Sequence, residues 1–503
     1  MNTQPCHPPP QQTHGLSWGV CLFAVIAGMF AAVVAKNLGA YAADSDTSGY
    51  FHEARLLGAG RLFAPQRALE GLAATGRLDY VYCPLGFRPE AGGRLAPTYP
   101  SGFPLQIAAL GRVLGQPAGA AAAIWLNAVG AFILTGGLLR ACGVSWRGTL
   151  AASVVFGASP LVLFMGVQLM SDLPATAWVT GAVLAAIAGA RRPAWAAVSG
   201  LVFSVAVLIR PTNLLAVLPV AILLGTDWRR WVRFASAGLP TAAFLAFLNE
   251  RLYGSPIITG YGDVGYLFGA GYLPGTLAHY ALWLPVVFTP LVALAPVGAW
   301  PGAPAPARVR LALVAWVVAY FGFYAFYRCT HEAWWYLRFV LPACPAWLAL
   351  AALGADRLLA RMRPAVATLG SLAVLACAAA WLVHWDRRLF ALEIGRGQRV
   401  YEDACTRAAA LPDDPVILTM QTSGALFYYT DRAIVRWDML QPGDFARLKE
   451  LCLRSRRPVY AFLFPFEEHA LTDGTCPGTW RRLEQFGPVS IWRLETGAPD
   501  GSS

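Results

Sequence analysis

Charged residues are scarce in this sequence: only 13% of its 503 positions are Asp, Glu, Lys or Arg, while 57% are hydrophobic. A soluble chain usually has roughly a quarter charged residues, so this one has too little polar surface to cover a soluble fold of its length. The shortage excludes a soluble enzyme and predicts a polytopic α-helical membrane protein.

Lysine is almost missing as well, since Lys36 and Lys449 are the only lysines among 39 basic residues. The formal net charge is +11, but the arginines lie in twos and threes between apolar runs and do not line one soluble face. This distribution excludes nucleic acid as a partner and indicates membrane topology.

The ten cysteines do not form a disulfide framework, because five fall on the inner side or in predicted spans: Cys6, Cys21, Cys142, Cys344 and Cys377. The other five are expected outside, where two pairings stay open, namely one bridge within the group Cys405, Cys452 and Cys476, and one between Cys83 and Cys329. The chain has no internal repeat.

Long apolar runs are abundant. The first, residues 16–35, is long enough to cross about 30 Å of hydrocarbon, and no cleavage-type boundary follows it, so we expect an uncleaved span. Ten more are expected at residues 118–140, 148–168, 173–190, 194–209, 211–226, 233–252, 280–298, 310–328, 338–355 and 365–385. The sequence therefore predicts about eleven transmembrane helices.

Two polar regions stand apart from these runs. Residues 36–104 form a long loop after the first span, and such loops usually carry function. Prolines at its end are expected to prevent helix before residue 105, so residues 105–114 predict a short interfacial or re-entrant helix. Residues 1–387 are assigned to a membrane domain and residues 388–503 to a small α/β domain. In the latter we expect strands at 415–420, 433–437, 459–464 and 489–494, and helices at 398–411 and 444–455.

Arginines indicate the orientation. With the N-terminus inside, the inner connections hold twelve arginines: Arg140, Arg147, Arg191, Arg192, Arg229, Arg230, Arg233, Arg308, Arg310, Arg357, Arg361 and Arg363. The short outer connections have only Arg210, Arg328 and Arg338, as the positive-inside rule requires. We therefore expect a multi-pass protein of the cell inner (plasma) membrane with a cytoplasmic N-terminus. The first loop and the C-terminal domain would be extracytoplasmic.

Four acidic or basic side chains stand out on the outer face. Apolar residues recur at helical spacing after Asp46, which puts Asp46 where a helix N-cap is expected. Asp172 begins a later span on the same face, where cap and chemistry are again both open; two converging carboxylates can deprotonate a hydroxyl and hold a metal or a proton. Arg210 and Arg338 lie at membrane depth, where charges are usually matched. Their partner is either an internal acid or a phosphate, which arginine grips with two parallel hydrogen bonds.

These motifs resemble those of the GT-C glycosyltransferases, and most closely the branch of protein O-mannosyltransferases and lipid A aminoarabinose transferases. The resemblance lies in Asp46-Thr-Ser-Gly-Tyr50-Phe-His-Glu-Ala54, Tyr99-Pro-Ser-Gly-Phe-Pro104, Met170-Ser-Asp172-Leu-Pro174 and Arg338-Phe-Val-Leu-Pro342. The family usually has Asp-Glu where this chain has Asp46-Thr47, so a second acid would come from Asp44 or Glu53, or would be absent.

The resemblance implies a membrane enzyme that moves a sugar, with inversion, from a polyprenyl-phosphate donor to a lipid, glycan or protein acceptor. It implies Asp46 as general base, Asp172 as a group that orients the acceptor or a metal, and Arg210 and Arg338 as the phosphate site. A divalent metal ion is an option. Further contributors would be Asp44, Glu53, Tyr99 and His331. The alternative for His331, which precedes Glu332, is that it belongs to the solvated belt of side chains at the membrane interface. The rival function is a transporter or flippase of lipid-linked sugars, although the absence of internal repeats argues against it.

The topology can be tested with reporter fusions. A reporter after Leu382 should score outside, and one at Arg230 or Arg361 should score inside, because inner connections carry the arginines. An outside signal at Arg230 would put Asp46 and Asp172 on opposite membrane faces and contradict a shared site.

Overall fold

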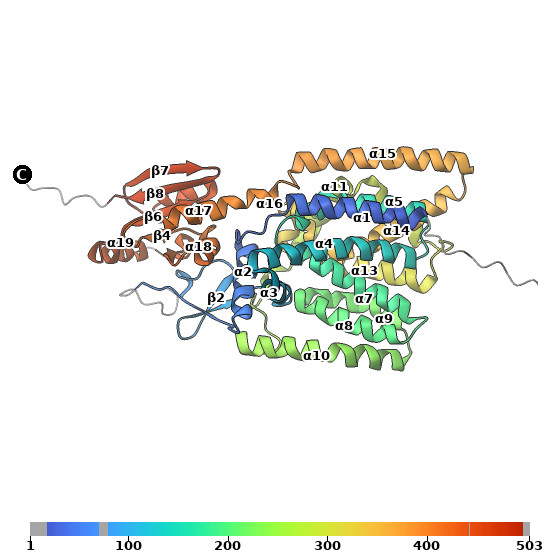
Figure 1. Cartoon of the computed structure of the whole chain (residues 1–503), viewed down its shortest axis with the longest axis horizontal. Coiled ribbons are helices and arrows are strands. Elements are labelled where there is room, and N and C mark those ends of the chain that lie inside the picture. The colour runs from blue at the N-terminus through green and yellow to red at the C-terminus, as the bar shows by residue number, and fades with distance from the viewer. Residues whose placement is uncertain (1–17, 70–78, 442, 496–503) are drawn as a thin grey trace, which may run out of the picture.

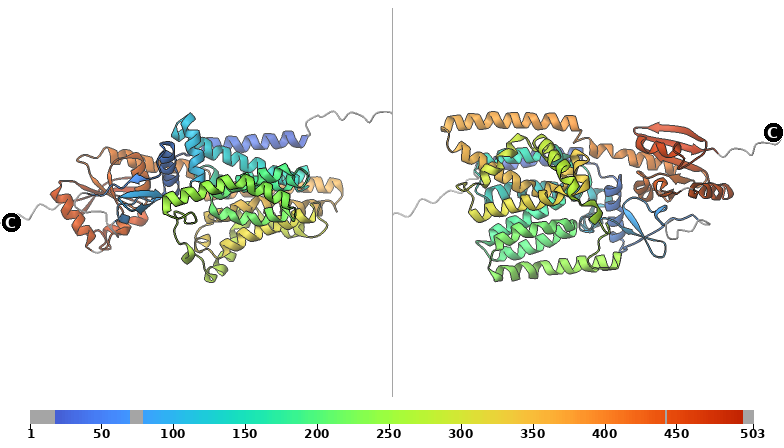
Figure 2. Two further views of the ribbon diagram at one scale, coloured as in Figure 1. Left: turned by 90° about the horizontal axis from the view of Figure 1, so that it is seen from below. Right: turned by 180° about the vertical axis from the view of Figure 1, so that it is seen from behind.

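The computed structural model describes residues 18–69, 79–441 and 443–495. A bundle of long helices forms one part, and a smaller α/β body lies against one end of it (Figure 1). The second and third views show the same arrangement from other sides (Figure 2). Helix α2, Ser45–Gly58, lies between the two parts and runs across the ends of the bundle helices.

Seven helices in the described ranges are long and apolar enough to cross a membrane. They comprise α1 (Trp18–Asn37), α4 (Gln116–Ala141), α7 (Asp172–Gly189), α10 (Trp228–Tyr253), α13 (Ala307–Ala325), the continuous pair η7 and α14 (Trp334–Ala343 and Cys344–Leu359), and the helix that begins with α15 (Pro364–Leu389). The count rises to nine when each of two bent helix pairs is taken as one span.

The predicted count of eleven is not confirmed, for two local reasons. The expected spans 148–168 and 280–298 are each broken near a proline, because Pro160 begins α6 (Pro160–Gly166) after α5 (Trp146–Gly157), and Pro290 follows α11 (Leu273–Phe288). The bends are 58° and 114°. The expected spans 194–209 and 211–226 are the shorter apolar helices α8 (Ala194–Ile209) and η2 with α9 (Pro211–Ala216 and Val217–Leu224).

The long loop contains regular structure. Besides α2 it has a small antiparallel sheet in the order β1 (Ala64–Pro65), β3 (Arg94–Pro97), β2 (Phe87–Glu90). The short helix expected after it is α3, Gly102–Leu114. Its predicted start at residue 105 is wrong, because Pro104 lies in the first helical turn, where a missing N–H costs no hydrogen bond.

The C-terminal body has a five-stranded sheet in the order β5-β4-β6-β8-β7. All four predicted strands are present as β4 (Val416–Leu418), β5 (Ala433–Val435), β6 (Val459–Leu463) and β8 (Val489–Leu494), and both predicted helices as α17 (Arg399–Ala409) and α19 (Asp444–Arg454). The sequence analysis missed β7 (Trp480–Phe486), whose side chains are mostly exposed, and the short helix α18 (Ser423–Tyr429). The domain boundary at residue 387 stays a prediction.

All nine cysteines in the described ranges are free, so neither expected bridge forms; Cys6 lies outside those ranges. Side chains alternate across β4, which places Ile417 with Cys405 in one core cluster and Val416 with Cys452 and Cys476 in the other. The sheet therefore separates Cys405 from the other two. The cluster around Cys405 also includes Leu56, Cys83 and Phe87 of the first loop. The loop and the C-terminal body thus share a core.

Candidate active site

The N-terminus of α2 fixes the position of the first acid. Asp44 has extended backbone angles, and its side chain accepts a hydrogen bond from the Thr47 N–H at 3.0 Å. Asp44 is therefore the N-cap, and the expectation that Asp46 caps the helix is wrong. Asp46 instead lies in the first turn, where the helix dipole favours a negative charge and its carboxylate is free to meet another segment.

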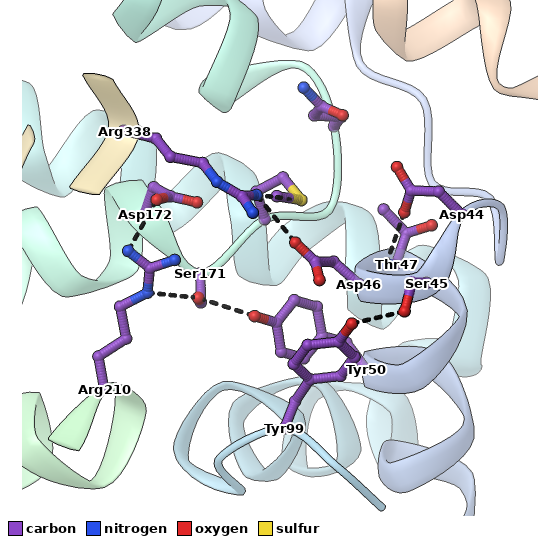
Figure 3. A network of polar contacts seen from close by, with 12 residues as sticks. Asp44, Ser45, Asp46, Thr47, Tyr50, Tyr99, Ser171, Asp172, Arg210 and Arg338 are labelled. Atoms are coloured by element: carbon purple, nitrogen blue, oxygen red, sulfur yellow. Dashed lines mark hydrogen bonds and ion pairs between the residues drawn. The ribbon is translucent and has the colours of Figure 1, made fainter. Parts of the chain in front are cut away.

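Asp46 meets Arg338, which comes from η7 of the bundle. Arg338 Nη1 donates to Asp46 Oδ2 at 2.8 Å, and the two side chains are 15% and 20% exposed. Arg338 Nη1 also lies 3.9 Å from the sulfur of Met170 (Figure 3). The partner of this guanidinium is thus an internal acid, one of the two alternatives that the sequence left open.

A second acid–arginine pair lies beside the first. Asp172, the first residue of α7, is 2.8 Å from Nη1 of Arg210, and its side chain is fully buried. Ser171 connects the pair to α2, because its hydroxyl accepts from Arg210 Nε at 3.0 Å and from the Tyr50 hydroxyl at 2.8 Å. Figure 3 shows both pairs converging from the bundle and α2 into one polar cluster.

The two acids at the start of α2 have different electrostatic environments. Burial and the neighbouring charge of Asp46 raise the pKa of Asp44. Burial also acts to raise the pKa of Asp46, but the Arg338 guanidinium, a hydrogen bond from Tyr99 and the charge of Arg210 together outweigh it and hold that pKa below its usual range. Asp46 is consequently the carboxylate that stays ionised, and Asp44 is the one that holds its proton more tightly.

Three further predicted residues have different outcomes. The Tyr99 hydroxyl forms a 2.7 Å hydrogen bond with Ser45 Oγ, and its ring lies 5.1 Å from that of Tyr50, so Tyr99 belongs to the cluster. Glu53 is only 2% exposed and lies two turns beyond Asp46 on α2. The ring of His331 packs 6.0 Å from that of Tyr272, and among the described residues no hydrogen bond or ion pair joins it to the acid–arginine pairs.

Sequence analysis missed two members of the cluster, Ser171 and Tyr50, as site residues. Signals for both were present: Ser171 directly precedes Asp172, and Tyr50 follows Asp46 by one helical turn. Neither carries a charge, so neither stands out in the sequence as a polar group at membrane depth.

The cluster does not offer a metal-binding donor set. In the part of the chain that the structure describes, no three His, Cys, Asp or Glu side chains gather closely enough to hold a metal ion. Asp46 faces one arginine and Asp172 another, while Asp44 caps its helix. These residues therefore do not fit a resident divalent metal.

An apolar groove runs along the bundle from near the cluster. It has a volume of about 750 Å³ and is lined by side chains of α3, α4, α7 and α8. On α7 the lining extends from Ala177 to Ala188, about 16 Å at the rise of a helix. Asn127 and Gln106, joined by a 2.7 Å hydrogen bond, are its polar lining residues.

No protein-family model and no curated protein sequence matches this chain. Solved structures do. ArnT from Cupriavidus metallidurans bound to undecaprenyl phosphate matches with a TM-score of 0.59 and 15% identity, over 96% of this chain and 99% of ArnT. The arabinofuranosyltransferase AftD from Mycobacteria matches with a TM-score of 0.53 and 17% identity, over 95% of this chain and 40% of AftD.

The oligosaccharyltransferase of Archaeoglobus fulgidus, solved in complex with Zn and sulfate, matches with a TM-score of 0.51 and 11% identity, over 88% of this chain and 68% of that chain. All three are GT-C glycosyltransferases. The chain has the GT-C fold. The match to ArnT runs along nearly the whole of both chains, so the bundle, the loop and the C-terminal body all belong to this architecture. It confirms the resemblance drawn from the four motifs.

Buried Glu53 should make the free energy of unfolding depend on pH. Burial raises its pKa from 4.5 to about 8, so the folded state binds its proton more tightly than the unfolded state does. The free energy of unfolding should therefore fall as pH rises from 4.5 to about 8. Glu53→Gln should flatten this dependence in thermal melts of the purified protein. Glu450→Gln, at an exposed position on α19, should keep it. An unchanged pH slope in Glu53→Gln would contradict the raised pKa.

Proposed function

We propose that this chain is a membrane glycosyltransferase that moves a sugar, with inversion, from a polyprenyl-phosphate donor to an extracytoplasmic lipid, glycan or protein acceptor. The support is a GT-C fold in which two acid–arginine pairs lie together at the end of the bundle that faces the C-terminal body. One of the fold's solved members, ArnT, was captured with undecaprenyl phosphate, which makes this carrier the natural donor class to test.

The observation that carries the proposal is an unused donor on Arg338. Its Nε atom is buried and has no hydrogen-bond partner among the described residues. A buried donor without a partner is costly, and a phosphate oxygen is the acceptor that a guanidinium matches best. The donor's phosphate would therefore bind at Arg338 beside Asp46.

Phosphate binding would also activate the base. Without donor, Arg338 lowers the pKa of Asp46, which makes Asp46 a weak proton acceptor. A phosphate bound to Arg338 offsets part of that positive charge, so the proton affinity of Asp46 rises when the donor is in place.

The reaction then follows from the positions of these groups. Asp46 accepts the proton of an acceptor hydroxyl or amine while the acceptor's oxygen or nitrogen attacks the anomeric carbon of the sugar. The bond from that carbon to the phosphate oxygen breaks, and polyprenyl phosphate leaves with the electron pair. Arg338 and Arg210 stabilise the charge that grows on it.

Asp172 has a supporting role in this scheme. Its carboxylate is fully buried against Arg210, so we assign it to hold Arg210 toward the leaving phosphate through the same contact. The apolar groove along α7 would take part of the prenyl tail, because it is apolar and begins within two helical turns of Asp172.

A transfer assay distinguishes this function from its rival. Purified protein in vesicles is incubated with radiolabelled polyprenyl-phosphate sugars and candidate acceptors, and the products are separated by chemical class. Label that leaves the carrier for an acceptor supports the transferase. Label that only changes membrane leaflet, still attached to its carrier, would establish a flippase instead.

The phosphate site can be tested at the two arginines. Arg338→Lys keeps the charge but loses the planar two-bond grip, so donor affinity or turnover should fall about tenfold or more. Arg210→Lys should have a smaller effect, since lysine can still neutralise buried Asp172. Parental donor affinity together with parental turnover in Arg338→Lys would remove that residue from the site.

Asp46 can be tested by removing its charge while keeping its shape. Asp46→Asn should still fold and insert, at some cost in stability because Arg338 loses its counterion, and should bind donor, yet lose about a hundredfold to ten-thousandfold in transfer rate, as expected for loss of a general base. Asp44→Asn is the matched control: asparagine caps a helix about as well as aspartate, so this variant should stay close to the parent. Near-normal turnover in Asp46→Asn would end its assignment as base.

A further inference from the structure

Helix α2 presents opposite faces to two different partners. About 3.6 residues make one helical turn, so Asp46 and Tyr50 lie on one face, while Ser48, His52 and Arg55 lie on the other. The first face makes the contacts with the bundle. The second packs against α18 of the C-terminal body, a segment that the proposed reaction does not use.

The closest approach is at Gly424, in the first turn of α18. A Cβ atom added there would lie 2.1 Å from Ser48 Oγ and 3.0 Å from the carbonyl oxygen of Leu85. The adjacent Ser423 hydroxyl accepts a hydrogen bond from the Leu85 N–H at 3.1 Å. Glycine is thus needed for α18 to lie this close to the first turns of α2.

Tyr428 extends the contact along the same face of α2. Arg55 Nη1 donates to the Tyr428 carbonyl oxygen at 3.0 Å, and its guanidinium carbon lies 3.5 Å from the centre of the Tyr428 ring. That ring also lies 5.0 Å from the ring of His52 and 5.4 Å from that of Phe51. A cation, two aromatic side chains and the imidazole therefore fix how α2 is rotated about its axis.

Helix α18 also holds the residues that lead into α2. The Tyr429 hydroxyl accepts a hydrogen bond from the Ala42 N–H at 3.1 Å. The first turn of α2 is consequently clamped between α18 on one side and Arg338 on the other. A shift of that turn by a fraction of an ångström would alter the 2.8 Å contact between Asp46 and Arg338.

We propose that α18 of the C-terminal body positions the first turn of α2, with Gly424 as the positioning residue that sets where Asp46 stands relative to Arg338. The kinetic consequence rests on the proposed transferase function. The structural consequence, a less firmly held α2, does not depend on it.

Gly424→Ala tests both consequences in the full-length protein. Hydrogen–deuterium exchange at the amides of residues 47–50 should become about tenfold faster or more, because the added methyl pushes α18 away from Ser48. In the transfer assay kcat should fall about tenfold or more, with the KM for the polyprenyl-phosphate donor within about twofold of the parent. The acidic limb of the pH profile of kcat should move to higher pH, because a looser Arg338 contact lowers the pKa of Asp46 less.

Two matched variants serve as controls. Gly397 lies in the same body. A Cβ added there would meet no described heavy atom within 4 Å, apart from its chain neighbours and the backbone of its own helix. Gly397→Ala should therefore behave like the parent. The double variant Ser48→Gly with Gly424→Ala lacks the side chain that the new methyl meets. Its kcat should therefore be close to that of Ser48→Gly alone, whereas Gly424→Ala alone should fall well below the parent.

If Gly424→Ala does not fold, Arg55→Met provides the test, because it removes the contact with Tyr428 and keeps an aliphatic side chain. It should raise exchange at residues 47–50 and lower kcat in the same way. Parental exchange and parental kcat in the folded variants would overturn the positioning role. A different result would separate the two ideas: faster exchange in the variants, together with a parent protein that transfers no sugar. It would overturn the proposed function and leave the positioning of α2 standing.

Discussion

The ion pair between Asp46 and Arg338 joins segments 292 residues apart and holds the candidate site together. Both side chains are largely buried, and removing one partner of such a pair leaves an uncompensated charge, which costs far more than the intact pair contributes. An anion beside the arginine therefore stabilises the fold. Before substrate arrives that anion is Asp46, so the resting site is neutral and its guanidinium is already oriented. A phosphate would meet a preorganised donor group.

Asp46 cannot serve fully as counterion and as base at the same time. While Arg338 depends on it, its pKa is lowered, and it takes up a proton poorly. Under the proposed reaction the conflict is resolved by the donor, whose phosphate replaces part of the carboxylate's electrostatic role. Acceptor deprotonation would then be efficient only after the donor has bound. Under that proposal, the arrangement would keep Asp46 from deprotonating an acceptor when no sugar donor is bound.

Sequence reasoning found the charged members of the site, because a charge at membrane depth is rare and the arginine distribution placed all four on one face. It could not say which acid meets which arginine. That depends on how η7 and η2, two irregular 3-10 segments, pack beside α7 and α2. The cap of α2 was misplaced by two residues for a similar reason: Asp44 and Asp46 are equally good caps by residue type, and only the backbone angles decide between them. The breaks in two expected spans have a local cause, because each falls at a proline, Pro160 or Pro290, inside a run that hydropathy alone reads as continuous.

The C-terminal body shows where short motifs stop being informative. Its strands were predicted because apolar runs of that length bounded by turn residues are distinctive, whereas the seven-residue helix α18 is too short to give a periodic signal. Yet α18 supplies the surface on which α2 rests, through a glycine and two tyrosines that carry no charge. Since α2 has its other face on the bundle, Asp46 lies on a helix that packs against both the bundle and the C-terminal body, and Tyr428 of α18 shares one core cluster with Tyr50 and Phe51. Under the proposed positioning, a change in the packing of either part would reach the carboxylate through the helix, without contacting the substrate.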